Sequence, residues 1–340
     1  MISRVADHCF WFGRYLERAE STARLLESTR TMAFDAGIPV TQCWLPLVIV
    51  SGQLPDFRER LGEEKAGDGE FVQRHMSFSE DNFVSLLRSI DAARENARVV
   101  RETLSEEVWH EVNSLYHWFH DGRAEALFDS DREGFYAHVR RGVQLALGLV
   151  RSTMLHDEPM SFLWLGVMLE RIGQIARILD MHHHTMERER QQPGNLTWAS
   201  AGIVEEALWL SLLRSCSGFD AYRKLNHGRV TVNTMIQFVV FEPRFPRALF
   251  YCVRASYRIL KDVWPVGLPT HTADGMDAAR RLESLMDWML GQKSNLATIS
   301  IHDLLTHVVD ETAISCQEIG EEIRKGGRPE PVIKTESTEQ

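Results

Sequence analysis

The sequence has none of the short motifs that mark the commonest nucleotide-binding and hydrolase sites. It contains no Gly-x-x-x-x-Gly-Lys-Ser/Thr phosphate-binding loop, no Gly-x-Gly-x-x-Gly fingerprint and no Gly-x-Ser-x-Gly nucleophile elbow. Without these motifs, the chain gives no support to nucleotide binding by either route, or to a serine nucleophile of the hydrolase type. We therefore expect no nucleotide cofactor.

Cysteines are few and scattered. The five cysteines form no Cys-x-x-Cys spacing, and they are Cys9, Cys43, Cys216, Cys252 and Cys316. No apolar run approaches the length of a membrane span, and the first residues carry charges where a signal peptide would need an apolar stretch. These absences predict a protein of the reducing cytoplasm, without a membrane partner, whose cysteines are small buried hydrophobic residues.

Patterns of metal ligands are equally sparse. Helical di-iron proteins use two Glu-x-x-His motifs on facing helices, but this chain has a single one, Glu107 to His110. His182, His183 and His184 are consecutive, so on a helix they point in different directions, whereas ligands need spacings of three or four residues. We expect no metal site and no cofactor of any kind.

Strand signals are missing, and helix signals fill the chain. There is no convincing hairpin and no alternation of strands with helices, so we predict an all-α fold. A composition with 44% apolar and 25% charged residues is typical of a soluble globular protein. The formal net charge of −10 argues against a broad phosphate-binding surface, so we expect no nucleic-acid partner.

Prolines and capping residues divide the chain into helical segments. Ser77–Glu80 and Ser300–Asp303 indicate capping boxes, Ser105 indicates a helix start, and Pro159 indicates a break before a helix that opens at Ser161. The expected helices span 11–27, 43–50, 77–103, 105–120, 132–155, 161–192, 203–217, 231–239, 246–263, 274–291 and 300–324. Residues 326–340 are polar and contain proline, so we expect them to be disordered.

The first long helix has a counterpart within the same chain. Residues 11–27 read WFGRYLERAESTARLLE and residues 164–180 read WLGVMLERIGQIARILD, which align without a gap at an offset of 153 (164 − 11). The identical pairs are Trp11/Trp164, Gly13/Gly166, Leu16/Leu169, Glu17/Glu170, Arg18/Arg171, Ala23/Ala176, Arg24/Arg177 and Leu26/Leu179. We interpret the chain as a single domain over 1–325, a multi-helix bundle with two quasi-repeated halves, 1–155 and 156–325.

Charged residues on the repeated helices form the candidate site. Glu17 and Arg24 share a flank of the first helix, and the second copy keeps both while its surroundings become apolar. A charge in such a place must be paired or hydrogen-bonded. Two interpretations stay open: a structural ion-pair network between the helices, or a ligand site in which Arg holds a carboxylate and Glu an amine. The candidate residues are Arg14, Glu17, Arg18, Glu20, Arg24, Glu170, Arg171 and Arg177.

Matching glycines predict how the two helices meet. Gly13 and Gly166 occupy equivalent positions, and glycine in a helix interior costs roughly 0.5–1 kcal/mol relative to alanine, which suggests a packing reason. We predict that the helices pack closely about a quasi-twofold axis. The oppositely charged pairs expected within reach across this interface are Glu17 with Arg177 and Arg24 with Glu170.

Several segments resemble the bacterial alpha-E domain family. MISRVADHCFWFGRYLERAESTARLL (1–26) is similar to the family's opening, SRVAE…YWxGRYxERAExxAR, and residues 94–113 and the second helix match further elements in order. Residues 238–249, FVVFEPRFPRAL, resemble its FL…D..FPRS element, with Glu242 where Asp is usual and Ala248 where Ser is usual. The resemblance spans nearly the whole chain, although no role is carried onto position 248.

The resemblance implies a helical protein that works beside a peptide-forming enzyme. Members of the family tend to occur beside, or fused to, a circularly permuted ATP-grasp peptide ligase, often with a transglutaminase-like cysteine peptidase. We therefore expect an accessory protein that binds the ligase, or the peptide that is made or processed. The alternative is an enzyme acting on an amino-acid-like or peptide substrate, in which a buried Glu of the repeated helices is the general base and Arg fixes a carboxylate.

Overall fold

The computed structural model describes residues 3–35, 40–191, 208–227, 230–263, 278–294 and 300–324. Within these ranges every regular element is a helix, which confirms the all-α class. The bounds are α1 (Ser3–Asp35), α2 (Val40–Val50), α3 (Leu54–Asp56), η1 (Phe57–Leu61), η2 (Glu63–Gly67), α4 (Gly69–Phe78), α5 (Leu86–Val99), η3 (Arg101–Thr103), α6 (Glu106–His120), α7 (Arg123–Ser130), α8 (Arg132–Thr153), α9 (Glu158–Gln191), α11 (Phe219–Leu225), α12 (Val232–Phe241), α13 (Leu249–Val263), α14 (Ala278–Lys293) and α15 (Ile301–Arg324). Among these helices, none combines the length and the apolar character that a membrane crossing would require.

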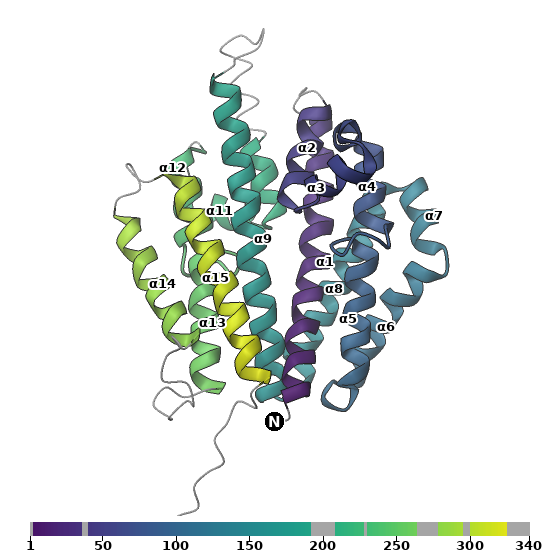
Figure 1. The fold of residues 1–340 in the computed structure, drawn as a ribbon, viewed down its shortest axis with the longest axis vertical. Coiled ribbons are helices and arrows are strands. Elements are labelled where there is room, and N and C mark those ends of the chain that lie inside the picture. Colours follow the sequence, from purple (N-terminus) through teal and green to yellow (C-terminus); the bar gives the residue numbers. More distant parts are fainter. Residues whose placement is uncertain are drawn as a thin grey trace, which may run out of the picture.

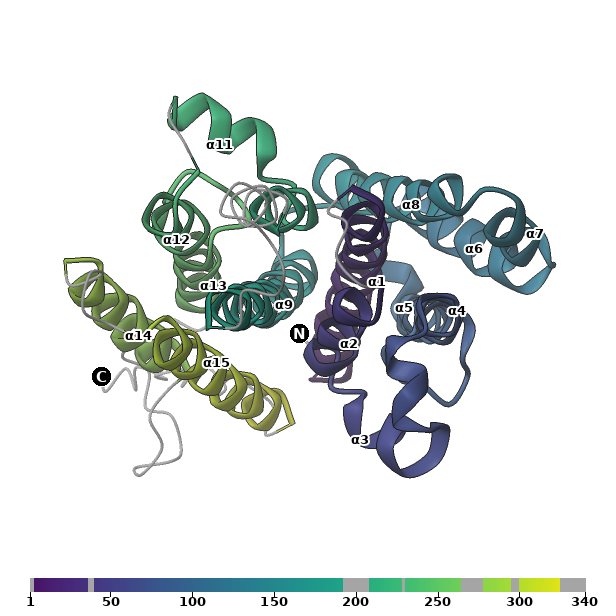
Figure 2. The same ribbon diagram turned by 90° about the horizontal axis from the view of Figure 1, so that it is seen from above.

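Two long helices, α1 and α9, form the centre of the bundle and lie side by side (Figure 1). Seen from above, α5 and α8 pack on the far side of α1, while α13 and α15 pack on α9 (Figure 2). Both central helices are longer than expected, because α1 extends the predicted 11–27 at both ends and α9 begins before Ser161. Pro159 does not break α9, since it lies in the first turn, where its missing N–H has no helical partner to lose.

The apolar surface of α9 explains why this helix is central. Leu163, Val167, Ile172 and Ala176 are fully buried although they point in different directions around the helix. A helix that is apolar all round must be covered on every side. Its neighbours α1, α13 and α15 provide this cover, so any charged residue on the middle of α9 must find its partners inside the protein.

Helix starts test the capping arguments. The capping box predicted at Ser77–Glu80 is wrong, because Ser77 is already buried in the last turn of α4. Instead, α5 begins after Ser85, whose hydroxyl accepts a hydrogen bond from the amide three residues on at 3.2 Å. The starts predicted at Ser105 and Ser300 are confirmed, since each hydroxyl accepts a hydrogen bond from the amide three residues on.

The segment before α13 differs from the prediction in a way that matters for the site. A helix was expected over 246–263, but α13 begins only at Leu249, and residues 242–248 are irregular. This irregular segment passes close to the central helices, since the carbonyl oxygen of Pro246 accepts a hydrogen bond from Arg171 of α9 at 3.2 Å. The ranges 203–207, 274–277 and 326–340, on which other predictions fall, lie outside the described residues.

Candidate functional site

The crossing of α1 and α9 is built on two glycines. A side chain on Gly13 would fall on the carbonyl oxygen of Leu163, and a side chain on Gly166 would fall on that of Phe10. The two backbones are therefore in direct contact, which confirms the predicted close packing of the repeated segments. These contacts are reciprocal, because both pairs are related by the same offset of 153 (163 − 10 and 166 − 13). The wider division into two related halves stays a prediction.

The same crossing joins two Glu-Arg dipeptides, one from each helix. Arg171 of α9 donates two hydrogen bonds to Glu17 of α1, at 3.0 and 2.6 Å. Arg18 of α1 donates two to Glu170 of α9, at 2.7 and 3.0 Å. Each glutamate is therefore held by the arginine of the other dipeptide in a bidentate pair, which fixes direction as well as distance.

The partners predicted for the other arginines are wrong. Arg24 does not bind Glu170 but Glu20, four residues back on its own helix, at 2.9 and 2.6 Å. Arg177 does not bind Glu17, and within the described residues it makes no hydrogen bond or ion pair. The reason is the position of the crossing, because the helices touch at Gly13 and Gly166, four residues before the glutamates but eleven before Arg24 and Arg177.

One half of the network is fully paired, and its glutamates and arginines are buried. We call it the Glu17 side, and it consists of Glu17, Glu20, Ser21, Arg24, Gln144, Arg171 and Arg247. Arg247 donates to Glu17 at 2.8 Å and to Glu20 at 2.5 Å. Ser21 adds a bond to Glu17 at 3.1 Å, and Gln144 of α8 adds one to Glu20 at 3.0 Å. Because these two glutamates are 0% and 1% exposed, the protein replaces all of their water.

The arginines of the Glu17 side determine its charge state. Burial alone would raise the pKa of Glu20, but the charges of Arg247 and Arg24 outweigh burial and lower the pKa to about 2. Burial likewise acts to lower the pKa of Arg247, and the charges of Glu17 and Glu20 outweigh it and raise that pKa. Glu20 is thus ionised at neutral pH and holds no proton to exchange.

The other half of the network is partly open. We call it the Glu170 side, and it consists of Arg14, Arg18, Glu170, Gln174 and Arg177. Glu170 accepts hydrogen bonds from Arg14 at 2.9 Å and from Gln174 at 3.2 Å, in addition to the pair from Arg18. The side chains of Arg14 and Arg18 remain 19% and 15% exposed.

Aromatic side chains of α1 hold these two arginines in place. The guanidinium carbon of Arg14 lies 4.8 Å from the ring centroid of Trp11, and that of Arg18 lies 5.2 Å from the ring of Tyr15. Both rings are half-buried, so the arginines lie against a fixed surface. The positive charges of the Glu170 side are therefore positioned by the protein.

Charges do not balance on the Glu170 side. Burial would raise the pKa of Glu170, but the charges of Arg18 and Arg14 lower it to about 2. Arg177 is exposed, yet enough protein surrounds it that desolvation lowers its pKa; Glu170 opposes this effect, and Arg18 and Arg14 add to it. Three guanidinium groups therefore share the surroundings of one carboxylate.

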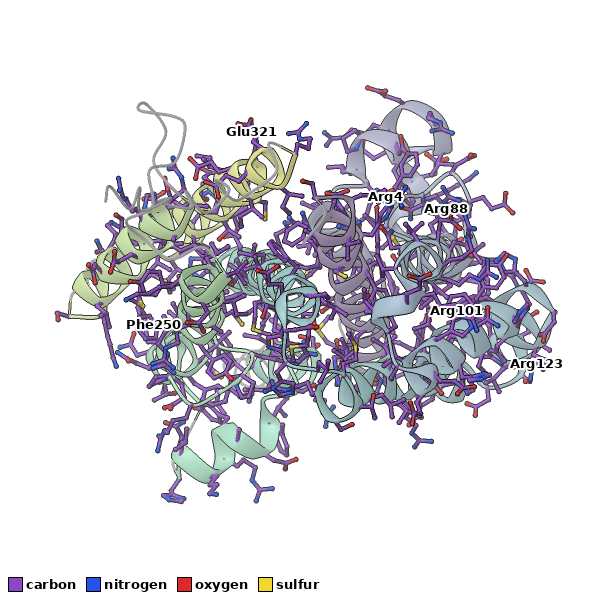
Figure 3. The ribbon with its side chains drawn as sticks, turned by 90° about the horizontal axis from the view of Figure 1, so that it is seen from below. Arg4, Arg88, Arg101, Arg123, Phe250 and Glu321 are labelled. Atoms are coloured by element: carbon purple, nitrogen blue, oxygen red, sulfur yellow. The ribbon has the colours of Figure 1, made fainter. Side chains whose placement is uncertain are left out.

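Seven of the eight candidate residues are joined by hydrogen bonds, and Arg177 belongs to the Glu170 side through the charges around it. Their assignment as ligand-binding residues stays a prediction. Sequence reasoning missed Arg247, because it lies in an irregular segment rather than on a repeated helix. The signal available in the sequence was the apolar segment 245–249 (FPRAL), in which Arg247 is the one charged residue, since a charge among apolar residues needs an internal partner if it is buried. By contrast, the labelled Arg123 lies at the edge of the molecule (Figure 3).

Metal binding finds no support in this arrangement. Across the described residues, no group of three or more His, Cys, Asp and Glu side chains is placed to hold a metal ion. The single Glu-x-x-His motif does not act as a unit, because His110 lies 3.4 Å from Glu106 on an exposed helix surface. The network itself favours anions over cations, since arginines outnumber its glutamates.

Comparison with known proteins gives one family and several relatives. The model of the Alpha-E family, described as "a predicted alpha-helical domain with a conserved ER motif", matches residues 1–326. Uncharacterized proteins of Mycobacterium bovis and of two strains of Mycobacterium tuberculosis are 23% identical over 275 residues. The match covers 76% of this chain but only 30% of each relative, so the chain corresponds to less than a third of their length. No solved structure matches the chain.

Proposed function

Because the chain belongs to the Alpha-E family, we propose that it is an accessory helical protein of a peptide-forming system. Its partner is an ATP-grasp peptide ligase, a transglutaminase-like peptidase or both, and its role is in the synthesis or processing of a small peptide. The resemblance described above supports the choice of partner. The geometry of the crossing supports an accessory role rather than a catalytic one.

The observation that carries the proposal is that each glutamate of the two Glu-Arg dipeptides is already bound by the arginine of the other dipeptide. A general base that works near neutral pH needs a pKa near that pH and access to its substrate. Arginines lower the pKa of Glu20 and Glu170 to about 2, and Glu17 is 0% exposed and held by two arginines. Glu20 and Glu170 therefore act as fixed structural anions, Glu17 is closed off from a substrate, and the enzyme alternative has no general base among the three.

The length of the relatives also supports a module that works beside other domains. In the mycobacterial relatives the matched region is 30% of the chain, so there it forms one part of a longer protein. A rigid bundle centred on α1 and α9 can present its outer helices as a binding surface.

Co-purification and ligase turnover test this proposal. The full chain is co-expressed with an ATP-grasp peptide ligase of the same organism, the complex is isolated by size exclusion, and ligase turnover is followed as phosphate release with and without the chain. We expect a stable complex and a change in turnover of several-fold. Absence of both a complex and a change would contradict the proposal, whereas turnover of a peptide by this chain alone would favour the enzyme alternative.

A further inference from the structure

The two sides of the crossing differ at one pair of equivalent positions. Glu20 on α1 corresponds to Gly173 on α9 (20 + 153 = 173), just as Arg24 corresponds to Arg177 (24 + 153 = 177). On the Glu17 side, Glu20 places its carboxylate against Arg24 four residues on. On the Glu170 side the arginine is present, but the carboxylate that would hold it is not.

Among the residues that the structure describes, the space beside Gly173 is open. Outside its own helix backbone and chain neighbours, a Cβ atom built on Gly173 would meet, of these residues, only Arg177 within 4 Å, with Nη2 at 3.3 Å and Cζ at 3.8 Å. This differs from Gly13 and Gly166, where a Cβ would fall on the backbone of the opposite helix. Gly173 therefore does not serve close packing, and what it leaves is a gap next to a guanidinium group.

The glutamate already present cannot fill this gap. Both carboxylate oxygens of Glu170 accept hydrogen bonds from Arg18. One of them also accepts a hydrogen bond from Arg14, and the other accepts one from Gln174. Arg177 is solvent-exposed and, within the described residues, makes no hydrogen bond or ion pair. Three arginines against one glutamate leave an excess of two positive charges, which partial removal from water makes attractive to an anion.

We propose that the Glu170 side binds the carboxylate of an amino acid or short peptide at the position that the Glu20 carboxylate occupies on the Glu17 side. Arg177 is its main partner, and Arg14 and Arg18 provide fixed positive surroundings. The choice of a carboxylate rests on the protein's own precedent, since the matched half of the network accommodates a carboxylate there. The peptide as ligand rests on the proposed function, but the binding test needs no ligase.

Two substitutions probe the site from opposite directions. Arg177→Gln removes the main partner of the ligand, and Gly173→Glu supplies a carboxylate from within the chain and blocks the site. The matched control is Arg123→Gln, because Arg123 is an exposed arginine at the edge of the molecule whose partner is Asp121 (Figure 3). Circular dichroism and thermal unfolding establish that each variant is folded before binding is measured.

The probes are N-acetyl-Ala-Ala, its C-terminal amide and inorganic phosphate. The arginine Nε–Hε signals of the intact chain are followed by NMR during titration, and Arg177→Gln assigns the signal of Arg177. We expect a saturable shift of this signal with N-acetyl-Ala-Ala and at least tenfold weaker binding of the amide. Binding should be lost in Gly173→Glu, weakened at least tenfold in Arg177→Gln and unchanged in Arg123→Gln.

Three results would overturn the proposal: equal binding of the amide, unchanged binding in Gly173→Glu, or tighter binding of phosphate than of the dipeptide. Because Arg177→Gln and Gly173→Glu alter the site in different ways, failure of one variant to fold leaves the other decisive. A negative binding result leaves the ligase complex intact, and a missing ligase complex leaves carboxylate binding intact, so the two proposals fail separately.

Discussion

The Glu17 side and the Glu170 side start from the same dipeptide on equivalent helices, yet they end in different states. On the Glu17 side, two glutamates that are 0% and 1% exposed are matched by three arginines, one of which comes from the segment before α13. On the Glu170 side, one glutamate is shared by arginines that stay 15–19% exposed. The difference follows from a few positions around the same pair of dipeptides, such as Glu20 where α9 has Gly173. The same motif can therefore be fully paired on one side and keep an excess of positive charge on the other.

The burial and full pairing of the Glu17 side have a defined effect on the free energy of unfolding. A buried ion pair adds little net stability compared with apolar residues of similar size, but removing one partner is costly because the other charge stays buried. We therefore expect the Glu17 side to fix the register of α1 against α9 rather than to add much stability. The more exposed Glu170 side can respond to changes with less damage, as a ligand site requires.

Acid should produce the largest effect, because it breaks both sides together. Glu20 and Glu170 have a pKa of about 2 in the folded protein against an ordinary value of 4.5, which corresponds to about 3 kcal/mol for each carboxylate. Since the folded pKa lies below the unfolded one, this stability is present above pH 4.5 and is lost as the pH falls toward 2. Urea unfolding at a series of pH values between 7 and 2.5 measures it.

His182 provides the control for this pH series. It is buried, and burial lowers its pKa from 6.5 to about 4, so the unfolded chain takes up the proton first as the pH falls. Its contribution is therefore lost between pH 6.5 and 4, which lies mostly above the range in which the carboxylates titrate. His182→Leu should remove this earlier slope and leave the later one. A stability that stays flat from pH 4.5 to 2.5 would contradict the buried carboxylate network.

Glutamate removal should separate the two sides. Glu17→Ala leaves Arg171 and Arg247 without their shared carboxylate at 6% and 9% exposure, so we expect a loss of about 3–5 kcal/mol in the free energy of unfolding. Glu170→Ala leaves arginines that can turn toward water, so we expect a smaller loss of about 2–3 kcal/mol. Chemical denaturation of both variants gives the two values.

The matched control for these variants is Glu95→Ala, because Glu95 forms an exposed ion pair with Arg98. Exposed pairs contribute little, so this change should stay within about 0.5 kcal/mol of wild type. If Glu170→Ala proved as costly as Glu17→Ala, the two sides would be equally closed and their distinction would be lost.

Alanine substitutions at Gly13 and Gly173 should change the free energy of unfolding in opposite directions. Gly13→Ala places a Cβ on the backbone of α9, so we expect a loss of about 1–3 kcal/mol from overpacking. Gly173→Ala adds a Cβ that meets only the end of Arg177 among the described residues, so it should be neutral or stabilise by about 0.5–1 kcal/mol. Thermal unfolding measured side by side checks the signs, and a gain from Gly13→Ala would disprove backbone contact at the crossing.

The central packing could be predicted from the sequence, but the pairing could not. The gapless repeat and the matching Gly13 and Gly166 were enough to place the two helices in contact. Helical periodicity assigns residues to faces, but it does not say where along a face two helices cross. The prediction therefore pairs Glu17 with Arg177 instead of Arg171, although the glycines mark a crossing one turn from Glu17.

The internal repeat does not predict which residues outside the repeated helices contribute to the site. Arg247 reaches Glu17 and Glu20 from a segment more than two hundred residues away, and no local pattern announces such a contact. The false capping box at Ser77 has a similar cause, because apolar burial extends α4 through a segment whose local residues favour a helix start. In both places tertiary packing outweighs local preference.

Adding a carboxylate at position 173 should have the smallest effect on stability of all these changes, and it tests the comparison of the two sides most directly. Gly173→Glu removes a helical glycine, worth about 0.5–1 kcal/mol, and creates a Glu-to-Arg pair four residues apart with Arg177, worth about 0.2–0.5 kcal/mol. The variant should therefore unfold at a slightly higher temperature than wild type. Gly173→Ala isolates the first part of this gain.

The pair itself is isolated by a double-mutant cycle. If Gly173→Glu reproduces the Glu20–Arg24 pair of the Glu17 side, its advantage over Gly173→Ala should disappear in an Arg177→Gln background and should shrink at high salt. An advantage that survives without Arg177 would show that the new carboxylate has another partner. In that case position 173 would not be the counterpart of position 20, and the open side would need a different explanation.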